Sequence, residues 1–170
     1  MTTTADRDPL RRGLAALGCA GLVLGACAPA EESDGDLATV TYVVDGDTIR
    51  VEMDGEEVAV RLLNLDTPEK DGPYTEAECL GVEATAFLAD LLPPGTEVRL
   101  EEDVEPTDRY GRHLAGVYLD DLLVNAEVAR AGLGVPVLVR PNDRFHDAVV
   151  AAHEEAQAAS RGLYDPANGC

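Results

Sequence analysis

The sequence predicts an α+β fold, in which five β-strands form a small barrel and three helices pack on it. Three observations lead to this prediction. The chain has 170 residues, about the length of one domain. From residue 39 on, three short strand-like runs follow one another, joined by Asp-Gly turns. Three stretches with helical spacing and two more strand-like runs come after them.

The first three strands are expected to form a meander. Residues 39–44 are β-branched and aromatic, which is typical of a strand. Apolar side chains alternate with others along residues 49–53 and 58–63, as in half-buried strands. The Asp-Gly pairs at residues 45–46 and 54–55 indicate tight turns. Because these turns are short, the three strands should be neighbours in one sheet.

The rest of the domain is predicted to add three helices and two strands. After a polar loop over residues 66–76, helical spacing covers residues 80–91, and Pro-Pro-Gly ends this helix. Strands are predicted near residues 98–100 and 113–119, with an acidic loop over 101–111 between them. Helices are predicted over 123–131 and 145–159. This order of elements is that of a five-stranded barrel of the OB type with packed helices.

The composition excludes several classes of function. Lys and Arg number 13 against 33 Asp and Glu, which gives a formal net charge of -20. A basic surface alone therefore cannot be what holds a nucleic acid. The chain has no run of 18 apolar residues, so the sequence predicts no membrane-spanning helix. The 4 cysteines include no CxxC pair, which argues against a zinc site.

Residues 1–26 are predicted to be a signal peptide. Three arginines precede an uncharged run over residues 13–26. The run ends in Leu24-Gly25-Ala26-Cys27, which resembles a bacterial lipobox. The resemblance implies that Cys27 is lipidated and that the protein is anchored to the membrane at the cell surface. An ordinary secretory signal, with release outside the cell, is the alternative. Residues 27–38 are expected to be an acidic flexible tether, and residues 39–170 the domain.

Two cysteines remain once the signal peptide and the lipidation site are set aside. Cys79 and Cys170 would then lie in a compartment that permits disulfides. A bridge between them would tie the last residue back to the domain, with at most about 4–5 kcal/mol of stabilisation for so long a loop. Two free thiols are the alternative.

Charged residues gather in three motifs near strand ends. The first is Asp45-Gly46-Asp47-Thr48. The second joins Arg61 to Asp66-Thr67-Pro68-Glu69. The third is Asp108-Arg109-Tyr110-Gly111-Arg112. Each motif alone is compatible with an ordinary turn or a solvated surface.

Together, the three motifs closely resemble the staphylococcal nuclease (thermonuclease) family, over about residues 39–166. The resemblance implies a calcium-dependent phosphodiesterase. It also implies DNA and RNA as substrates, 3′-phosphate ends as products and a monomeric protein.

The resemblance also implies a role for each motif residue. Asp47 and Asp66 would bind Ca²⁺ through their carboxylates and Thr67 through its backbone carbonyl. Asp45 would contact these ligands and not the ion itself. Glu69 would activate or position the attacking water. Arg61 and Arg112 would hold the scissile phosphate, and Arg109 and Tyr110 a neighbouring one.

Simple chemistry agrees with these roles. Ca²⁺ prefers oxygen ligands, and no His/Cys cluster competes for a softer metal. Guanidinium groups pair with phosphate oxygens in bidentate geometry, and a nearby carboxylate can act as a base. One departure from the family is that residues 134–139, where relatives carry a tyrosine over the base, contain no aromatic residue. Two alternatives stay open, namely a non-catalytic OB-fold module that binds nucleic acid or protein, and a calcium-binding surface lipoprotein.

Overall fold

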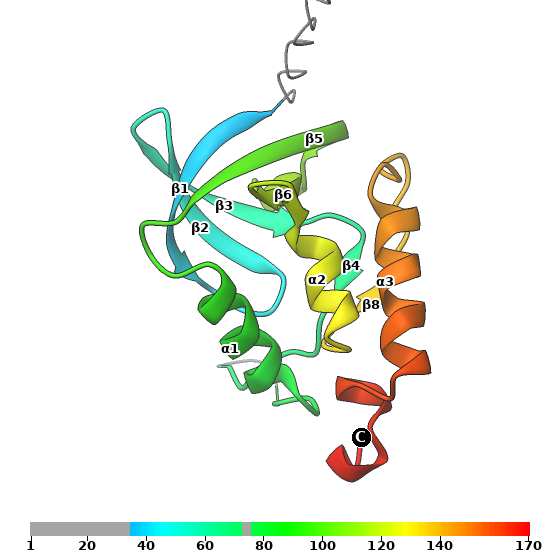
Figure 1. The fold of residues 1–170 in the computed structure, drawn as a ribbon. Coiled ribbons are helices and arrows are strands. Elements are labelled where there is room, and N and C mark those ends of the chain that lie inside the picture. Colours follow the sequence, from blue (N-terminus) through cyan, green and yellow to red (C-terminus); the bar gives the residue numbers. More distant parts are fainter. Residues whose placement is uncertain (1–34, 73–75) are drawn as a thin grey trace, which may run out of the picture. The chain divides into compact units, whose positions relative to one another are not determined.

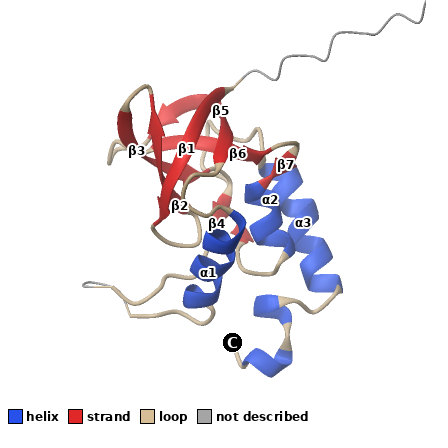
Figure 2. Cartoon of the chain, turned by 60° about the vertical axis from the view of Figure 1, so that its left-hand side comes forward, coloured by secondary structure: helices blue, strands red, loops and turns tan. Residues whose placement is uncertain are grey.

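A computed structural model of the chain describes residues 35–72 and 76–170, and it confirms the α+β fold (Figure 1). Five strands close into a barrel, and three helices pack beside it, as Figure 2 shows by colour. The predicted signal peptide, Cys27 and most of the predicted tether lie outside the described residues.

The barrel is a mixed sheet that closes on itself. Its strands are β1 (Asp36–Val43), β2 (Thr48–Met53), β3 (Glu56–Leu62), β5 (Glu97–Thr107) and β6 (His113–Leu119). They lie in the order β3-β2-β1-β5-β6, and a parallel pairing of β3 with β6 closes the barrel. Three two-residue strands complete the set: β4 (Leu65–Asp66), β7 (Leu122–Leu123) and β8 (Val135–Pro136). Strand β4 pairs with β8, and β7 pairs antiparallel with the end of β6.

The three helices lie close to their predicted positions. They are α1 (Gly81–Leu91), α2 (Val124–Arg130) and α3 (His146–Ala158), followed by the 3-10 turns η1 (Gly162–Tyr164) and η2 (Pro166–Asn168). Helices α2 and α3 lie side by side, and α1 lies across one end of the barrel (Figures 1 and 2). Among the described residues, no helix is both long enough and apolar enough to cross a membrane.

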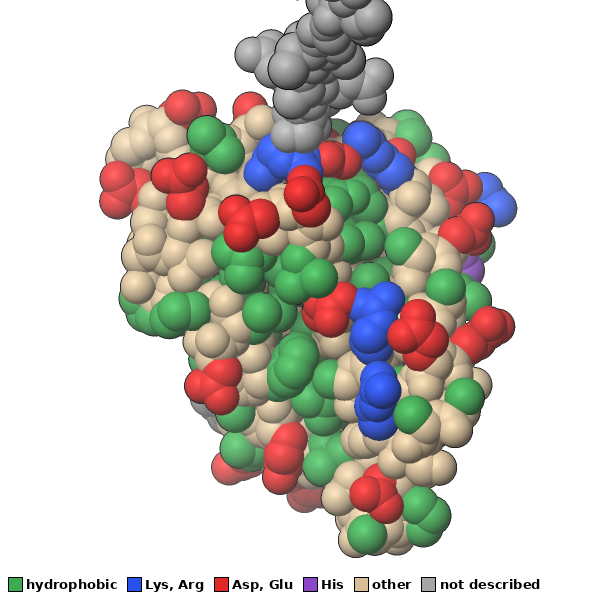
Figure 3. Space-filling model, viewed as in Figure 1, with side chains coloured by type: hydrophobic (Ala, Val, Ile, Leu, Met, Phe, Trp, Pro, Cys, Tyr) green, Lys and Arg blue, Asp and Glu red, His purple; other side chains and the backbone are tan. Residues whose placement is uncertain are grey.

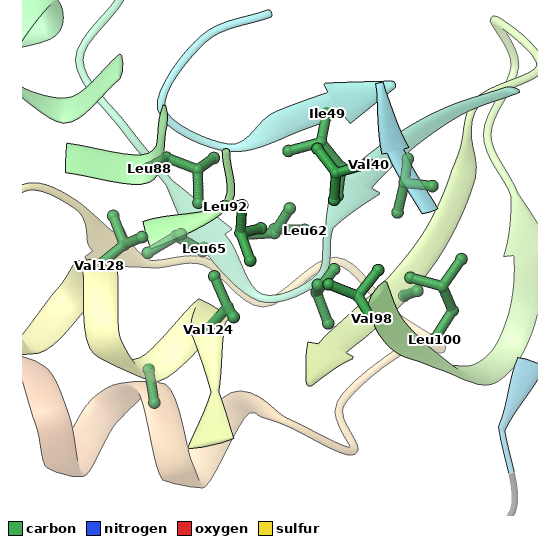
Figure 4. Packing of buried hydrophobic residues seen from close by; sticks show 14 of the residues in the cluster. Val40, Ile49, Leu62, Leu65, Leu88, Leu92, Val98, Leu100, Val124 and Val128 are labelled. Atoms are coloured by element: carbon green, nitrogen blue, oxygen red, sulfur yellow. The ribbon is translucent and has the colours of Figure 1, made fainter. Parts of the chain in front are cut away.

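The core is aliphatic, as expected from a chain without Trp. Inward residues of the barrel strands meet Leu88 and Leu92 at the end of α1, and Val124 and Val128 of α2 (Figure 4). Along β2 and β3 the buried side chains are Ile49, Val51, Val60 and Leu62. Residue Arg61 lies between two of these on β3 and therefore points to the other face of the sheet.

Two predicted boundaries differ from the structure. Strand β1 begins at Asp36, so residues 36–38 of the predicted tether belong to the sheet, where Ala38 is buried. The predicted acidic loop over 101–111 is wrong, because β5 continues to Thr107. Glu101, at the start of the acidic run, forms ion pairs with Arg99 on the same strand and, at 2.7 Å, with Arg144 from a distant part of the chain.

Candidate active site

The barrel register brings the three motifs together. On β3, Arg61 pairs with Thr48 of β2 on one side and with Leu114 of β6 on the other. Thr48 closes the first motif, and Leu114 lies two residues after the third. A further bond, from the Leu62 N–H to the Asp47 carbonyl at 2.8 Å, fixes the first motif against β3. Strands β2, β3 and β6 therefore place residues 45–48, 61–69 and 108–112 at one end of the barrel.

Two backbone carbonyls and two carboxylates hold the Arg61 guanidinium in a fixed position. Its Nη1 donates to the backbone carbonyls of Leu62 and Leu65, both at 2.7 Å. Its Nη2 lies 3.0 Å from a carboxylate oxygen of Asp47 and 3.0 Å from one of Asp66. A guanidinium can satisfy this many acceptors because its five N–H donors have a rigid planar geometry. The side chain is thus oriented before any substrate arrives.

Asp47 is a buried carboxylate with a dense set of hydrogen bonds. Its Oδ2 accepts from the backbone N–H and the hydroxyl of Thr67, both at 3.1 Å, and its Oδ1 accepts from the hydroxyl of Thr48. Burial raises the pKa of Asp47 to about 6, with Arg61 acting in the opposite direction and Asp45 adding to the rise. The group is therefore a poorly solvated anion that attracts a further positive charge.

Gly46 allows the first motif to approach the second. A Cβ atom at this position would lie 2.7 Å from the Thr67 hydroxyl and 2.8 Å from the Cβ of Ala84. No side chain fits at such distances, so the Asp-Gly-Asp turn can lie against the loop that carries Thr67 only with glycine here. Its neighbour Asp45 accepts from the N–H of Asp47 at 3.2 Å, which fixes the turn.

Arg112 is held by Asp108 within the third motif. Its Nε and Nη2 lie 2.8 and 2.7 Å from the Asp108 Oδ2, and its own N–H donates to the Oδ1 at 3.0 Å. The N–H of Tyr110 donates to the same oxygen at 2.9 Å. Partial burial would raise the pKa of Asp108, but these bonds from Arg112 and Tyr110 outweigh it and lower the pKa. The turn thus fixes the direction of Arg112.

Arg61 and Arg112 line the same pocket. This pocket has a volume of about 210 Å³, and Asp108, Asn64 and Leu114 also line it. Its remaining wall includes Val137 and Val139, in the stretch that the sequence showed to lack aromatic residues. Two guanidiniums beside an apolar wall can bind an anionic group together with an apolar ring.

Glu69 lies beside the acidic residues of the first two motifs, but it does not line that pocket. Partial burial raises the pKa of Glu69, and the negative charges of Asp45, Asp66 and Glu78 raise it further. Its carboxylate has no hydrogen bond or ion pair with another residue in the described part of the chain. A carboxyl group with a raised pKa is suited to accept a proton.

Arg109 and Tyr110 lie together on the turn before Arg112. The Arg109 Nη2 donates to the Tyr110 hydroxyl at 2.6 Å, and its guanidinium lies 4.7 Å from the centre of the tyrosine ring. Tyr110 is 69% exposed. With Arg112 and Asp45 it lines a second, open groove of about 490 Å³. Both residues are thus next to the Arg112 side of the site.

The first two motifs supply carboxylate oxygens of the kind that a hard cation accepts. Asp47 and Asp66 both lie 3.0 Å from the same Arg61 nitrogen, so the two carboxylates are close to each other and the guanidinium lies between them. Within residues 35–72 and 76–170, no three His, Cys, Asp or Glu side chains are grouped closely enough to hold a metal ion. Two carboxylates with a backbone carbonyl and water are nevertheless the oxygen donors that Ca²⁺ accepts.

Sequence reasoning gave no role to three residues that shape the site. These are Asp108, which holds Arg112; Asn64, whose amide donates to the Asn142 carbonyl at 3.0 Å beside the pocket; and Glu78, which contacts Glu69. The spacing of Asp108 and Arg112 was a usable signal, since an acidic residue often closes the turn that follows it. The roles of Asn64 and Glu78 depend on contacts that only the folded chain makes.

Acidic side chains are more widespread than basic ones on the face shown in Figure 3. On the face in Figure 3, red carboxylates are spread among apolar and neutral groups, and blue side chains form no broad patch. Cys79 and Cys170, which the sequence left as either a bridge or two thiols, form a disulfide with their Cα atoms 5.7 Å apart.

Comparison with known proteins agrees with this fold. The family model described as "Staphylococcal nuclease homologue" matches residues 59–165. A "Thermonuclease" of Staphylococcus intermedius is 38% identical over 131 residues, which cover 77% of each chain. A "Thermonuclease" of Staphylococcus hyicus is 37% identical over 74% of this chain and 73% of its own. "Endonuclease YncB" of Bacillus subtilis (strain 168) is 31% identical over 78% of this chain and 67% of its own.

These relatives support a nuclease built on an OB-type barrel, with two arginines and several carboxylates at one end. The chain belongs to the staphylococcal nuclease family.

Proposed function

We propose that the protein is a calcium-dependent endonuclease that hydrolyses phosphodiester bonds of DNA and RNA and leaves 3′-phosphate ends. The observation that carries this proposal is the pocket shared by Arg61 and Arg112, beside the Asp47–Asp66 pair. Curated relatives named thermonuclease and endonuclease support the same reaction class.

The two arginines would bind the scissile phosphate. Both are held by carboxylates and backbone groups, so their directions are set before a phosphate enters. The Nε and Nη2 of Arg112 contact Asp108, and its Nη1 has no hydrogen bond within the described residues, so it would turn to phosphate oxygens. Both terminal nitrogens of Arg61 already contact acceptors, so a phosphate would use its Nε–H or replace the exposed Asp66 carboxylate, and the more highly charged transition state would gain most from this. Arg109 and Tyr110, next along the chain, would contact the neighbouring phosphate.

Glu69 would accept a proton from the attacking water or hold that water in line. Its raised pKa and its carboxylate without a partner in the described residues support this role. Asp45 and Asp66 share its surroundings and keep the local charge negative, which favours a water held by hydrogen bonds to carboxylate oxygens.

Calcium would be held by the carboxylates of Asp47 and Asp66 and by the carbonyl of Thr67, with Asp45 behind Asp47. When bound, the ion would neutralise phosphate charge and polarise the phosphorus–oxygen bond. The raised pKa of Asp47 supports this assignment, because a buried carboxylate lacking enough positive charge gains from a cation.

A nuclease assay tests the proposal directly. The full chain is incubated with single-stranded DNA and with RNA, with calcium or with a chelator, and the product ends are analysed. Cleavage only with calcium, to give 3′-phosphate ends on both substrates, is the expected result. Binding without cleavage would instead support the alternative of a non-catalytic OB-fold module, and calcium uptake without either would support a calcium-binding lipoprotein.

Export and anchoring are part of the same proposal. The basic leader, the uncharged run and Leu24-Gly25-Ala26-Cys27 support lipidation of Cys27 and a location at the cell surface, with the enzyme acting as a monomer. Labelling with a fatty acid tests this directly. Label in the wild-type protein but not in Cys27→Ser is expected, and label in both would contradict it.

A further inference from the structure

Glu69 takes its position from its backbone and not from its side chain. The Glu78 N–H donates to the Glu69 carbonyl at 2.8 Å, and the Glu69 N–H donates to the Glu78 Oε2 at 3.1 Å. Glu78 therefore forms hydrogen bonds with both backbone polar groups of Glu69. The Glu69 carboxylate itself has no hydrogen-bond or ion-pair partner within the described residues, so nothing else there fixes its direction.

Gly81 adds steric contact from the same segment. A Cβ atom at Gly81 would lie within 2.9 Å of both the Glu69 carbonyl and the Lys70 nitrogen, so the two backbones touch. Leu80, just before it, has a φ of 67°, a left-handed conformation that the chain must hold in place. Residues 78–81 thus form one tight support for Glu69.

Residues 78–81 also carry the disulfide to Cys170, through Cys79. Cys79 lies directly after Glu78 and is bonded to Cys170, 91 residues away in the sequence. Within the described residues, no other disulfide joins the loop that carries Glu69 to the C-terminal half.

The tail that ends in Cys170 is itself firmly attached. The Asn168 side chain donates to the Gly162 carbonyl at 2.7 Å, and the Asp165 carboxylate accepts from the N–H of Ala167 at 2.9 Å. The N–H of Leu163 donates to the carbonyl of Gly132, just after α2, at 2.9 Å. The disulfide therefore fixes residue 79 to the α2–α3 part of the fold, not to a loose end.

Repulsion between carboxylates destabilises the contact between Glu78 and Glu69. Glu78 brings a negative charge to a region that already contains Asp45, Asp66 and Glu69, and like charges repel at short range. Without the covalent tie, this repulsion favours movement of residues 78–81 away from Glu69.

We propose that Glu78 and the Cys79–Cys170 disulfide form a clamp that positions Glu69 to activate or hold the attacking water, so that an oxidised bridge is needed for full turnover. This rests on the proposed role of Glu69. Glu78 is a positioning residue and touches neither pocket arginine. Loss of the clamp should therefore lower kcat and leave KM nearly unchanged, because the phosphate is held by Arg61 and Arg112.

The experiment compares four variants of the full chain. They are the double variant Cys79→Ser/Cys170→Ser, Glu78→Ala, Glu78→Gln and the control Val149→Ala. Glu78→Gln keeps an oxygen that can accept from the Glu69 N–H. Val149→Ala removes a buried contact of α3, so it lowers stability without touching the clamp. All are assayed at a temperature at which circular dichroism shows each to be folded.

The double variant and Glu78→Ala should each lose about tenfold or more in kcat, with KM within about twofold, since a displaced catalytic group costs turnover steeply. Glu78→Gln and Val149→Ala should stay within about threefold of the wild type. An unchanged kcat in Glu78→Ala, which keeps the disulfide, would overturn the proposal even if the double variant fails to fold.

A second measurement separates the clamp from the proposed function. Hydrogen exchange of the Glu69 amide, followed by NMR without calcium, should be faster in Glu78→Ala and in the double variant but not in Val149→Ala. Equal exchange in all variants would overturn the clamp. Full turnover in Glu69→Gln would contradict the role of Glu69 as base, and the exchange rates would still decide whether the clamp holds its backbone.

Discussion

Replacing Arg61 should cost the protein both stability and turnover, and the structure separates the two costs. The Arg61 and Asp47 side chains are only 16% and 10% exposed, and their charged groups lie 3.0 Å apart. Removing one partner of such a buried pair costs about 3–5 kcal/mol, because the other charge is left without a partner. Hydrogen bonds to Asp47 from Thr48 and Thr67 remain, so the lower end of this range is expected for Arg61→Ala.

The catalytic cost should be larger in relative terms. A single donor that stabilises the transition state contributes about 10²–10³-fold in turnover, so Arg61→Ala should lose at least about 10²-fold. Arg61→Lys should recover little of this, since a lysine cannot bind a phosphate in bidentate geometry. The double variant Arg61→Ala/Asp47→Asn should regain stability but not activity, because it removes the uncompensated buried charge without restoring the guanidinium.

A matched control is available in the same barrel. Arg99 pairs with Glu101 at nearly the same burial, 15% and 10%, but it lies away from the site. Arg99→Ala should therefore lose some stability in urea unfolding, but less than Arg61→Ala because Glu101 keeps its ion pair with Arg144, and it should keep its turnover within about threefold. Turnover is measured on DNA in the presence of calcium. A loss of less than fivefold in Arg61→Ala would refute the assignment of Arg61 to the phosphate.

Four further outcomes follow from the site. Arg112→Ala should also lose at least about 10²-fold in turnover, and Asp108→Asn should lower turnover less, by loosening Arg112; equal turnover in Arg112→Ala and wild type would contradict the shared pocket. Glu69→Gln should lower kcat more than calcium affinity in titration calorimetry, and the reverse pattern would make Glu69 chiefly a ligand. In the presence of a chelator, Asp47 should contribute fully to the free energy of unfolding below about pH 4. This contribution should be lost as pH rises through about 6, because the pKa of Asp47 is raised in the folded state. Calcium should therefore raise Tm more at pH 8 than at pH 5, and an equal rise at both pH values would contradict Asp47 as a ligand. Turnover should not fall steadily from low to high salt, because a net charge of -20 repels the substrate most when salt is low; a steady fall would contradict this.

The sequence by itself determined most of the elements and which side chains of the barrel strands face the core. Alternation along residues 49–53 and 58–63 fixes which side chains face the core, since successive residues in a strand point to opposite faces. The same rule places Arg61 on the outer face, and the structure agrees. Local patterns of this kind need no knowledge of distant contacts, so they can be read from the chain directly.

Only the tertiary structure decided which charged groups lie next to one another. The acidic run after Leu100 reads as a loop, but Arg144, 43 positions beyond Glu101, makes it compatible with a strand. The parallel pairing of β3 with β6 sets Arg61 beside the Arg112 turn, and the grip of Glu78 on Glu69 depends on how residues 78–81 fold back. Such contacts join residues far apart in sequence, and their energies depend on burial, which a linear pattern does not contain.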